Sequence, residues 1–184
     1  MTRFVGISDE TQINSKDVIT IKLPATGSFY QGVQFIAEKL ITGSRTNYVG
    51  EEVEAGTVDA ETVIIINQNV YKDEFGNRHG LVANVGKITY AAGETVTALR
   101  ASKNVILEMT ADCIVLNGTA SIADTVGKYL VPKVKGVDTK GKDDRKLVVV
   151  DTIGTAGTAY KIEAVSSIAQ PGVRAQSVIV RTMK

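Results

Sequence analysis

The stretch "ETVIIINQNVYKDEFGNRHGL" (Glu61–Leu81) begins as a run of β-branched residues and ends as a polar loop. An apolar run of this length, followed by turn residues, predicts a buried strand over "ETVIIIN". The loop carries the only histidine of the chain, His79, beside Asp73 and Glu74. The stretch therefore predicts part of the core, and it raises the question of whether the loop is an active site or only the end of a strand.

Similar short runs recur along the whole chain. In "DVITIKL" (Asp17–Leu23) the alternation predicts a strand with one buried face. "SFYQGVQFIAEKL" (residues 28–40) also has apolar residues at helical spacing, but Gly32 disfavours a helix and a strand is favoured. The chain has 17 glycines and is rich in Val, Ile and Thr. We therefore predict an all-β fold, a small barrel or sandwich of short strands with long Gly-rich loops.

The 184 residues provide enough material for one domain with its own core. We predict an N-terminal arm over residues 1–16, which buries little of its surface in the isolated chain, because a short apolar run is followed by the polar "SDETQINSK". A single β-rich domain is predicted over residues 17–184, with a weak seam of small residues at 118–127. The polar, glycine-containing segment Thr42–Val58 predicts a long loop or a hairpin arm.

Several glycine-containing stretches resemble ligand loops but are better explained as turns. "NGT" (Asn117–Thr119) predicts a turn, since Asn-Gly is a strong hairpin signal. "GTAGTAY" (Gly154–Tyr160) lacks the dinucleotide-binding pattern and predicts a hairpin turn between two strands. "GTASIADTVGKY" lacks the spacing of a phosphate-binding loop. The mixed-charge stretch Lys133–Lys146 predicts a solvated loop, with a rim that meets a partner as the alternative.

Composition disfavours nucleic-acid and membrane partners. The 21 basic and 20 acidic residues leave no basic excess to neutralise phosphates. No apolar run is long enough for a membrane span, and no signal peptide is recognisable, so we expect synthesis in a reducing cytoplasm. The tyrosines are expected to cap a small barrel core rather than to stack on bases. They are Tyr30, Tyr48, Tyr71, Tyr90, Tyr129 and Tyr160.

Catalysis would require a base, a group that orients it and a nucleophile. His79 is the candidate base, Asp73 or Glu74 the orienting group, and Cys113 the candidate nucleophile beside many Ser and Thr residues. No G-x-S-x-G motif is present, and one His with one Cys cannot form a structural zinc site. Cys113 lies in "ADCIVL", which predicts a buried thiol. We predict no catalytic, metal or cofactor residues, and no enzyme.

Three central stretches resemble a family of structural proteins from the head-gene region of tailed phages and prophages of Gram-positive bacteria. They are "VYKDEFGN", then "VGKITYAAGETVTALRASKNVILEMTAD", then "SIADTVGKYLVPKVKG". The family carries "V-x-Y-D-E", then "G-K-x-x-R-x-Y-x-L-x-x-G-D-x-F-x-x-T", then "V-G-K-Y". The resemblance covers roughly the central half of the chain, and none of its motifs is catalytic.

The match is incomplete in places. The first motif is matched with Lys72 inserted, and Lys103 and Asn104 replace the Gly-Asp of the second motif, whose spacing is longer here. The matching residues are Tyr71, Asp73, Glu74, Gly86, Lys87, Leu99, Val105, Leu107, Thr110, Gly127, Lys128 and Tyr129.

The resemblance implies a virion component made in a bacterial host cytoplasm. Its implied role is that of a capsid decoration (cement) protein, a homo-oligomer that binds the major capsid protein on the outer shell and stabilises it. Two alternatives share the β-rich architecture: a tail-tube or baseplate subunit, and a module that binds the host surface. The resemblance implies that the loop around His79 is a strand end with a turn. A hydrolase that uses His79 is the third alternative.

Overall fold

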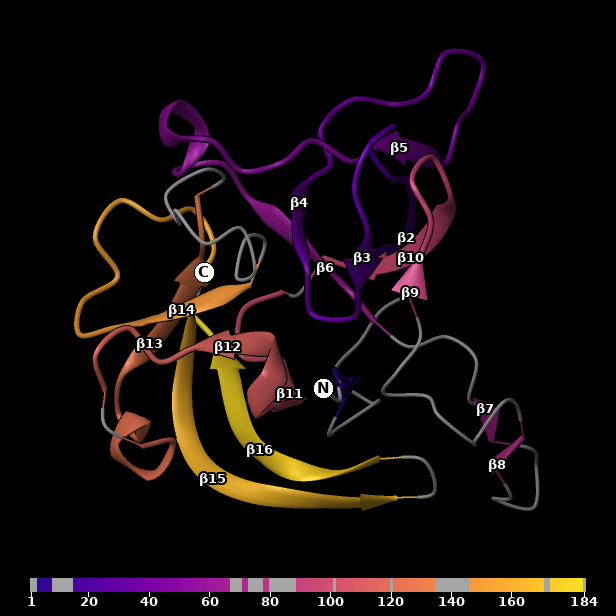
Figure 1. Cartoon of the computed structure of the whole chain (residues 1–184). Helices are drawn as coiled ribbons and strands as arrows, with labels where there is room; N and C mark the ends of the chain where they lie inside the picture. Colours follow the sequence, from indigo (N-terminus) through magenta and orange to yellow (C-terminus); the bar gives the residue numbers. More distant parts are fainter. Residues whose placement is uncertain are drawn as a thin grey trace.

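Most of the described strands belong to two sheets, which form two layers (Figure 1). The computed structural model describes residues 3–7, 15–66, 71–72, 78–79, 89–100, 102–119, 121–134, 146–170 and 173–183. Within these residues the helical segments are single 3₁₀ turns and all other regular structure is β. The predicted all-β class is confirmed.

The larger layer is a seven-stranded sheet with the order β1-β11-β16-β15-β13-β14-β12. Its strands are β1 (Val5–Ile7), β11 (Ile106–Thr110), β12 (Ile114–Val115), β13 (Tyr129–Pro132), β14 (Leu147–Val150), β15 (Tyr160–Gln170) and β16 (Val173–Thr182). Neighbours are antiparallel except β12 and β14, which are parallel. The two longest strands, β15 and β16, form one curved hairpin (yellow in Figure 1).

The smaller layer is a five-stranded sheet with the order β4-β6-β10-β2-β5. Its strands are β2 (Val18–Lys22), β4 (Gln34–Ile36), β5 (Asn47–Val49), β6 (Thr62–Ile65) and β10 (Thr95–Leu99). Just beyond β5, Glu51 exchanges two backbone hydrogen bonds with Ile36, of 2.8 and 2.9 Å. These bonds join the two edges of the sheet, so this layer closes into a small barrel.

Two short ribbons and four 3₁₀ turns complete the described structure. The ribbons are β3 (Phe29–Tyr30) with β9 (Thr89–Tyr90), and β7 (Tyr71–Lys72) with β8 (Arg78–His79). The turns are η2 (Ser15–Asp17), η3 (Ala55–Thr57), η5 (Ala111–Cys113) and η6 (Ala123–Thr125). Strands β3 and β4 confirm the strand prediction for residues 28–40. The segment Thr42–Val58 contains β5, which forms a hairpin with residues 39–41, and then η3.

Strand β6 explains why "VIII" is apolar throughout. Val63 and Ile65 point into the barrel core, whereas Ile64 and Ile66 belong to the core between the barrel and the seven-stranded sheet. One face of β6 packs in the barrel core and the other face packs in the core between the layers. All four residues of β6 are therefore buried. Strand β10 has the same arrangement, with Ala98 in one core and Leu99 in the other. The predicted core strand therefore connects the two layers.

The alternating and tyrosine patterns follow from the barrel. In β2, Ile19 and Ile21 are buried in the barrel while Lys22 is exposed, as the period-2 pattern predicts. Three tyrosines, which are Tyr30, Tyr48 and Tyr90, pack partly buried against the barrel core. This confirms the capping role for those three. Tyr160 differs, since it is fully buried between the layers and donates its hydroxyl to Gln34 Oε1 at 3.4 Å.

The prediction of a hairpin at Gly154–Tyr160 is wrong. The strands on either side, β14 and β15, are not neighbours, because β13 lies between them. The loop of residues 151–159 instead crosses β13 and covers the outer apolar side chains of β13 and β14. The turn at Asn117–Thr119 is confirmed, with positive φ angles of 47° at Asn117 and 83° at Gly118.

The N-terminal segment is more deeply integrated than predicted. Strand β1 pairs with β11 over Val5–Ile7, and Phe4 and Val5 are buried. For residues 3–7 the expectation of little burial is therefore wrong, because their apolar side chains complete the core beside β11. Residues 8–14 lie outside the described residues. The division into an arm at 1–16 and a domain at 17–184, with a seam at 118–127, stays a prediction.

Candidate functional site

The loop around His79 follows the barrel strand β6. The backbone of His79 pairs with Tyr71 in the small ribbon of β7 and β8. Asp73 and Glu74 lie outside the described residues, as do most residues of the mixed-charge stretch Lys133–Lys146. The structure describes only the backbone of His79, and the expectation that this residue has no catalytic role stays a prediction.

The candidate nucleophile Cys113 is enclosed by protein. Its side chain is 1% exposed and lies in the core between the two layers. Burial raises the pKa of the Cys113 thiol above its ordinary value, against smaller opposing effects from the hydrogen bond with Thr110 and the charge of Arg3. The thiolate, which is the nucleophilic form, is therefore disfavoured, and the sulfur has no open approach.

The contacts of Cys113 are those of a packing residue. Its sulfur lies 3.5 Å from Thr110 Oγ1, 3.6 Å from the Gln31 carbonyl oxygen and 3.8 Å from the Phe4 carbonyl oxygen. A side chain at Gly32 would come within 2.8 Å of the sulfur. Cys113 thus joins η5 to the residue before β1 and to the turn between β3 and β4. Its burial was predictable from its apolar neighbours.

We expect the thiol of the folded protein to resist modification. A thiol reagent such as dithionitrobenzoate should label Cys113 only as fast as the chain unfolds, and completely in denaturant. The matched control is Ser102→Cys, at an exposed position, which should react at once with one equivalent of reagent. Rapid labelling of the unsubstituted protein under native conditions would show that Cys113 is accessible.

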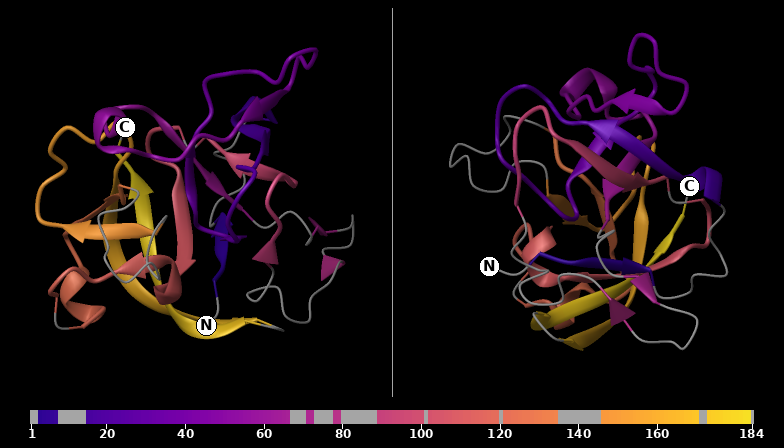
Figure 2. Two further views of the ribbon diagram at one scale, coloured as in Figure 1. Left: turned by 45° about the horizontal axis from the view of Figure 1, so that its top comes forward. Right: turned by 90° about the vertical axis from the view of Figure 1, so that its right-hand side faces the viewer.

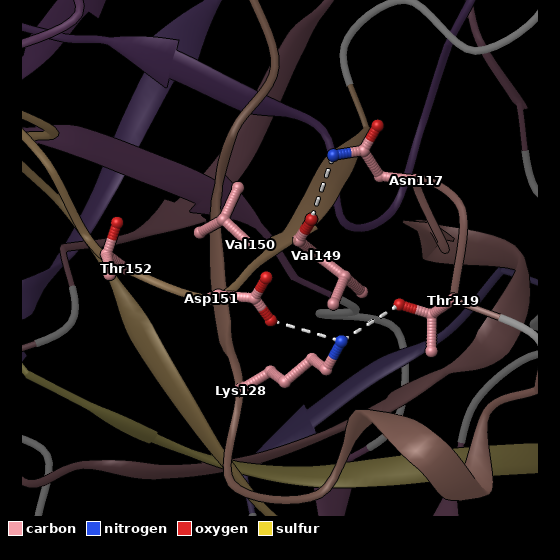
Figure 3. A pocket seen from close by; sticks show the side chains of 7 residues that line it. All are labelled: Asn117, Thr119, Lys128, Val149, Val150, Asp151 and Thr152. Atoms are coloured by element: carbon pink, nitrogen blue, oxygen red, sulfur yellow. Dashed lines mark hydrogen bonds and ion pairs between the residues drawn. The ribbon is translucent and has the colours of Figure 1, made fainter.

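A shallow hollow of about 330 Å³ lies beside β14 (Figure 3). Asn117, Thr119, Lys128, Val149, Val150, Asp151 and Thr152 line it. Lys128 Nζ lies 3.1 Å from Asp151 Oδ1 and 3.5 Å from Thr119 Oγ1. The Asn117 side-chain amide donates to the Val149 carbonyl oxygen at 3.3 Å.

The geometry of this hollow indicates a surface ion pair. The Asp151 side chain is 83% exposed, and such pairs contribute at most about 1 kcal/mol to stability. Lys128 belongs to the Gly127–Tyr129 motif, in which Gly127 has φ of 86° and donates its N–H to the Ile162 carbonyl oxygen at 2.9 Å. The motif therefore anchors the start of β13 against β15. No sequence motif joins Asn117 to Lys128, although both residues line the hollow.

Across the part of the chain that the structure describes, no group of three His, Cys, Asp or Glu side chains is placed to hold a metal ion. No helix among the described residues has the length and apolar character needed to cross a membrane.

Exposed apolar side chains lie on a projecting hairpin. We call Lys39–Val49 the 39–49 hairpin. Two backbone hydrogen bonds of 2.8 Å hold it: Val49 N–H donates to the Lys39 carbonyl oxygen, and Ile41 N–H donates to the Asn47 carbonyl oxygen. Leu40 is 47% exposed and Val49 is 37% exposed. Both lie where the hairpin leaves the barrel, so they offer apolar surface for contact with another protein.

Comparison with protein-family models finds no match for the chain, and comparisons with curated proteins and with solved structures find none either. The family resemblance therefore rests on the sequence motifs alone.

Proposed function

We propose that the chain is a virion structural protein, a capsid decoration (cement) protein that binds the major capsid protein on the outer shell of a tailed phage. The sequence motifs shared with phage head proteins support this role. In the described residues, those motifs fall on positions that maintain the fold. Leu99, Leu107 and Thr110 are fully buried, and Gly127 adopts a left-handed turn. A resemblance carried by buried positions supports a shared architecture.

The proposal is supported by the position of two projecting hairpins that offer surface for contact with other proteins. The 39–49 hairpin and the β15–β16 hairpin extend from opposite ends of the molecule (Figure 2). The first exposes Leu40 and Val49, and the second has a long strand edge. A protein that bridges neighbouring shell subunits needs contact surfaces at separate points of its body, and these projections supply two of them.

The test is the copy number of the chain in purified particles of the phage that encodes it, measured by quantitative mass spectrometry against the major shell protein. A decoration protein is expected at a level comparable to that of the shell protein. A few copies per particle would contradict shell decoration and favour a tail or baseplate position. Absence from particles would contradict any virion role.

The same measurement tests the 39–49 hairpin. Particles grown with Leu40→Ser should carry fewer copies, because burial of a leucine contributes about 2 kcal/mol, which lowers affinity by more than about tenfold when lost. Val126→Ser is the matched control, since Val126 is 50% exposed but lies away from the hairpin. Equal copy numbers for both variants would exclude this hairpin from the shell contact.

A further inference from the structure

Among the residues that the structure describes, no strand pairs with the outer edge of β15 over most of its length. On that side β13 pairs only with Tyr160 and Lys161, and Ile162 forms the last two backbone hydrogen bonds, with Gly127 and Lys128. From Glu163 to Gln170 the strand pairs only with β16 among the strands that the structure describes. Within the described part of the chain, no strand therefore uses the outer N–H and C=O groups of this stretch, which can pair with another strand.

The other sheet edges in the described chain are short or closed. In the seven-stranded sheet the edge strands are β1 with 3 residues and β12 with 2 residues. The barrel edges are joined through Ile36 and Glu51. Short and closed edges are the usual protection against strand addition. The long edge of β15 lacks this protection against strand addition.

The edge sequence also lacks the charges that discourage pairing. Glu163 forms an ion pair with Arg181, at 2.5 Å between the Oε1 and Nε atoms, and it marks a β-bulge between Ile162 and Ala164. Beyond it the edge reads "AVSSIAQ" (Ala164–Gln170), without a single charged residue. A bulge bends a strand and ends regular pairing. Pairing with β13 and the charged residues of this edge therefore end at nearly the same point of β15.

We propose that this edge pairs with the β15 edge of a second copy of the chain, as an antiparallel two-fold dimer. Residues opposite each other in an antiparallel pair point to the same face, so a two-fold pair must be centred on a residue rather than between two residues. The midpoint of 163–170 falls between Ser166 and Ser167. Whichever of these two serines lies on the axis, it faces the same serine of the second copy. Small hydroxyl side chains fit there, and no like charges meet.

The energetics favour a second copy as the occupant. Strand β16 pairs with β11 as far as Ser177, opposite Ser166, and beyond that point the described β15 and β16 form a ribbon of two strands. Such ribbons are marginally stable in water alone. Two-fold pairing converts two ribbons into one four-stranded sheet, β16-β15-β15-β16, and joins the seven-stranded sheets of both copies. This pairing does not depend on whether the chain decorates a shell.

Single cysteines on the edge test the dimer directly. Ser166→Cys and Ser167→Cys are introduced separately in the full chain, where the native Cys113 is buried. Under mild oxidation, the variant whose cysteine lies on the axis should form a disulfide dimer at least about tenfold faster than the exposed control Ser102→Cys. The faster of the two variants identifies the register. Equal rates for all three variants would overturn the proposal.

A charged side chain on the edge provides the second test. Light scattering should find the unsubstituted protein as a dimer, and Ser167→Lys as a folded monomer, because two lysines would meet near the axis. Ser102→Lys should remain a dimer. An unsubstituted protein that stays monomeric overturns self-pairing and leaves the edge to a strand of another protein. A dimer that Ser167→Lys does not weaken places the contact elsewhere and also overturns it.

Discussion

Replacing Gly157 with Ala is expected to lower the free energy of unfolding by about 3 kcal/mol and the Tm by about 10 °C. A side chain at Gly157 would overlap the backbone carbonyl oxygens of Asp59 and Ala60. Neither backbone group is a flexible side-chain end, so the loop of residues 151–159 must move away. Urea denaturation and thermal melting of the variant measure the loss.

The loss is large because this loop joins the two layers. Gly157 N–H donates to the Val58 carbonyl oxygen at 3.0 Å, and Thr62 N–H donates to Thr158 Oγ1 at 2.8 Å. Displacing the loop breaks both bonds and uncovers the outer face of β13 and β14. A displaced loop leaves buried polar groups of β6 without partners, which costs more than the bonds themselves.

Two other glycines serve as controls. Gly56→Ala should change stability little, because a side chain there meets nothing within 4 Å. Gly118 also has open space but a φ of 83°, so Gly118→Ala should cost only the strain of a left-handed residue, about 1 kcal/mol. If Gly157→Ala were as stable as Gly56→Ala, the loop would not be held tightly against Asp59 and Ala60.

The sequence predicted where strands occur better than it predicted which strands pair with each other. β-Branched runs such as Val63–Ile66 and the alternation in β2 are local signals, because burial repeats along a strand with a fixed period. Pairing of β1 with β11 joins segments about a hundred residues apart, which no local pattern records. The failed hairpin at Gly154–Tyr160 has the same cause. Its glycines correctly indicate a turn, but they do not show that β13 lies between the strands.

For the candidate sites, too, the sequence predicted local features but not which segments come together. The burial of Cys113 could be predicted, because its neighbours in "ADCIVL" are mostly apolar. The hollow beside β14 could not, since Asn117 reaches the Val149 carbonyl oxygen only through the parallel pairing of β12 with β14. The free edge of β15 is likewise a property of strand order. The sequence shows a long neutral strand, but only the topology shows that β13 leaves it after Lys161.

Replacing Phe35 with Ala is expected to lower the free energy of unfolding by about 4 kcal/mol. Phe35 is fully buried in the barrel, where its ring meets the edge of Phe29 at 5.5 Å between centroids. Phe35→Leu, which keeps most of the volume, should cost about 1 kcal/mol. Equal losses for the two variants would contradict tight packing around this ring.

The same variant tests whether the two layers unfold together. Tyr30, Tyr48 and Tyr90 pack against the barrel core. Because the chain has no tryptophan, they report on this core by fluorescence in a variant that keeps only these three of the six tyrosines. Cys113 lies in the other core and reports on it through thiol labelling. Since β6 and β10 place one face in each core, Phe35→Ala should shift both signals to the same lower urea concentration. Loss of the tyrosine signal while Cys113 stays protected would show that the seven-stranded sheet is stable without the barrel.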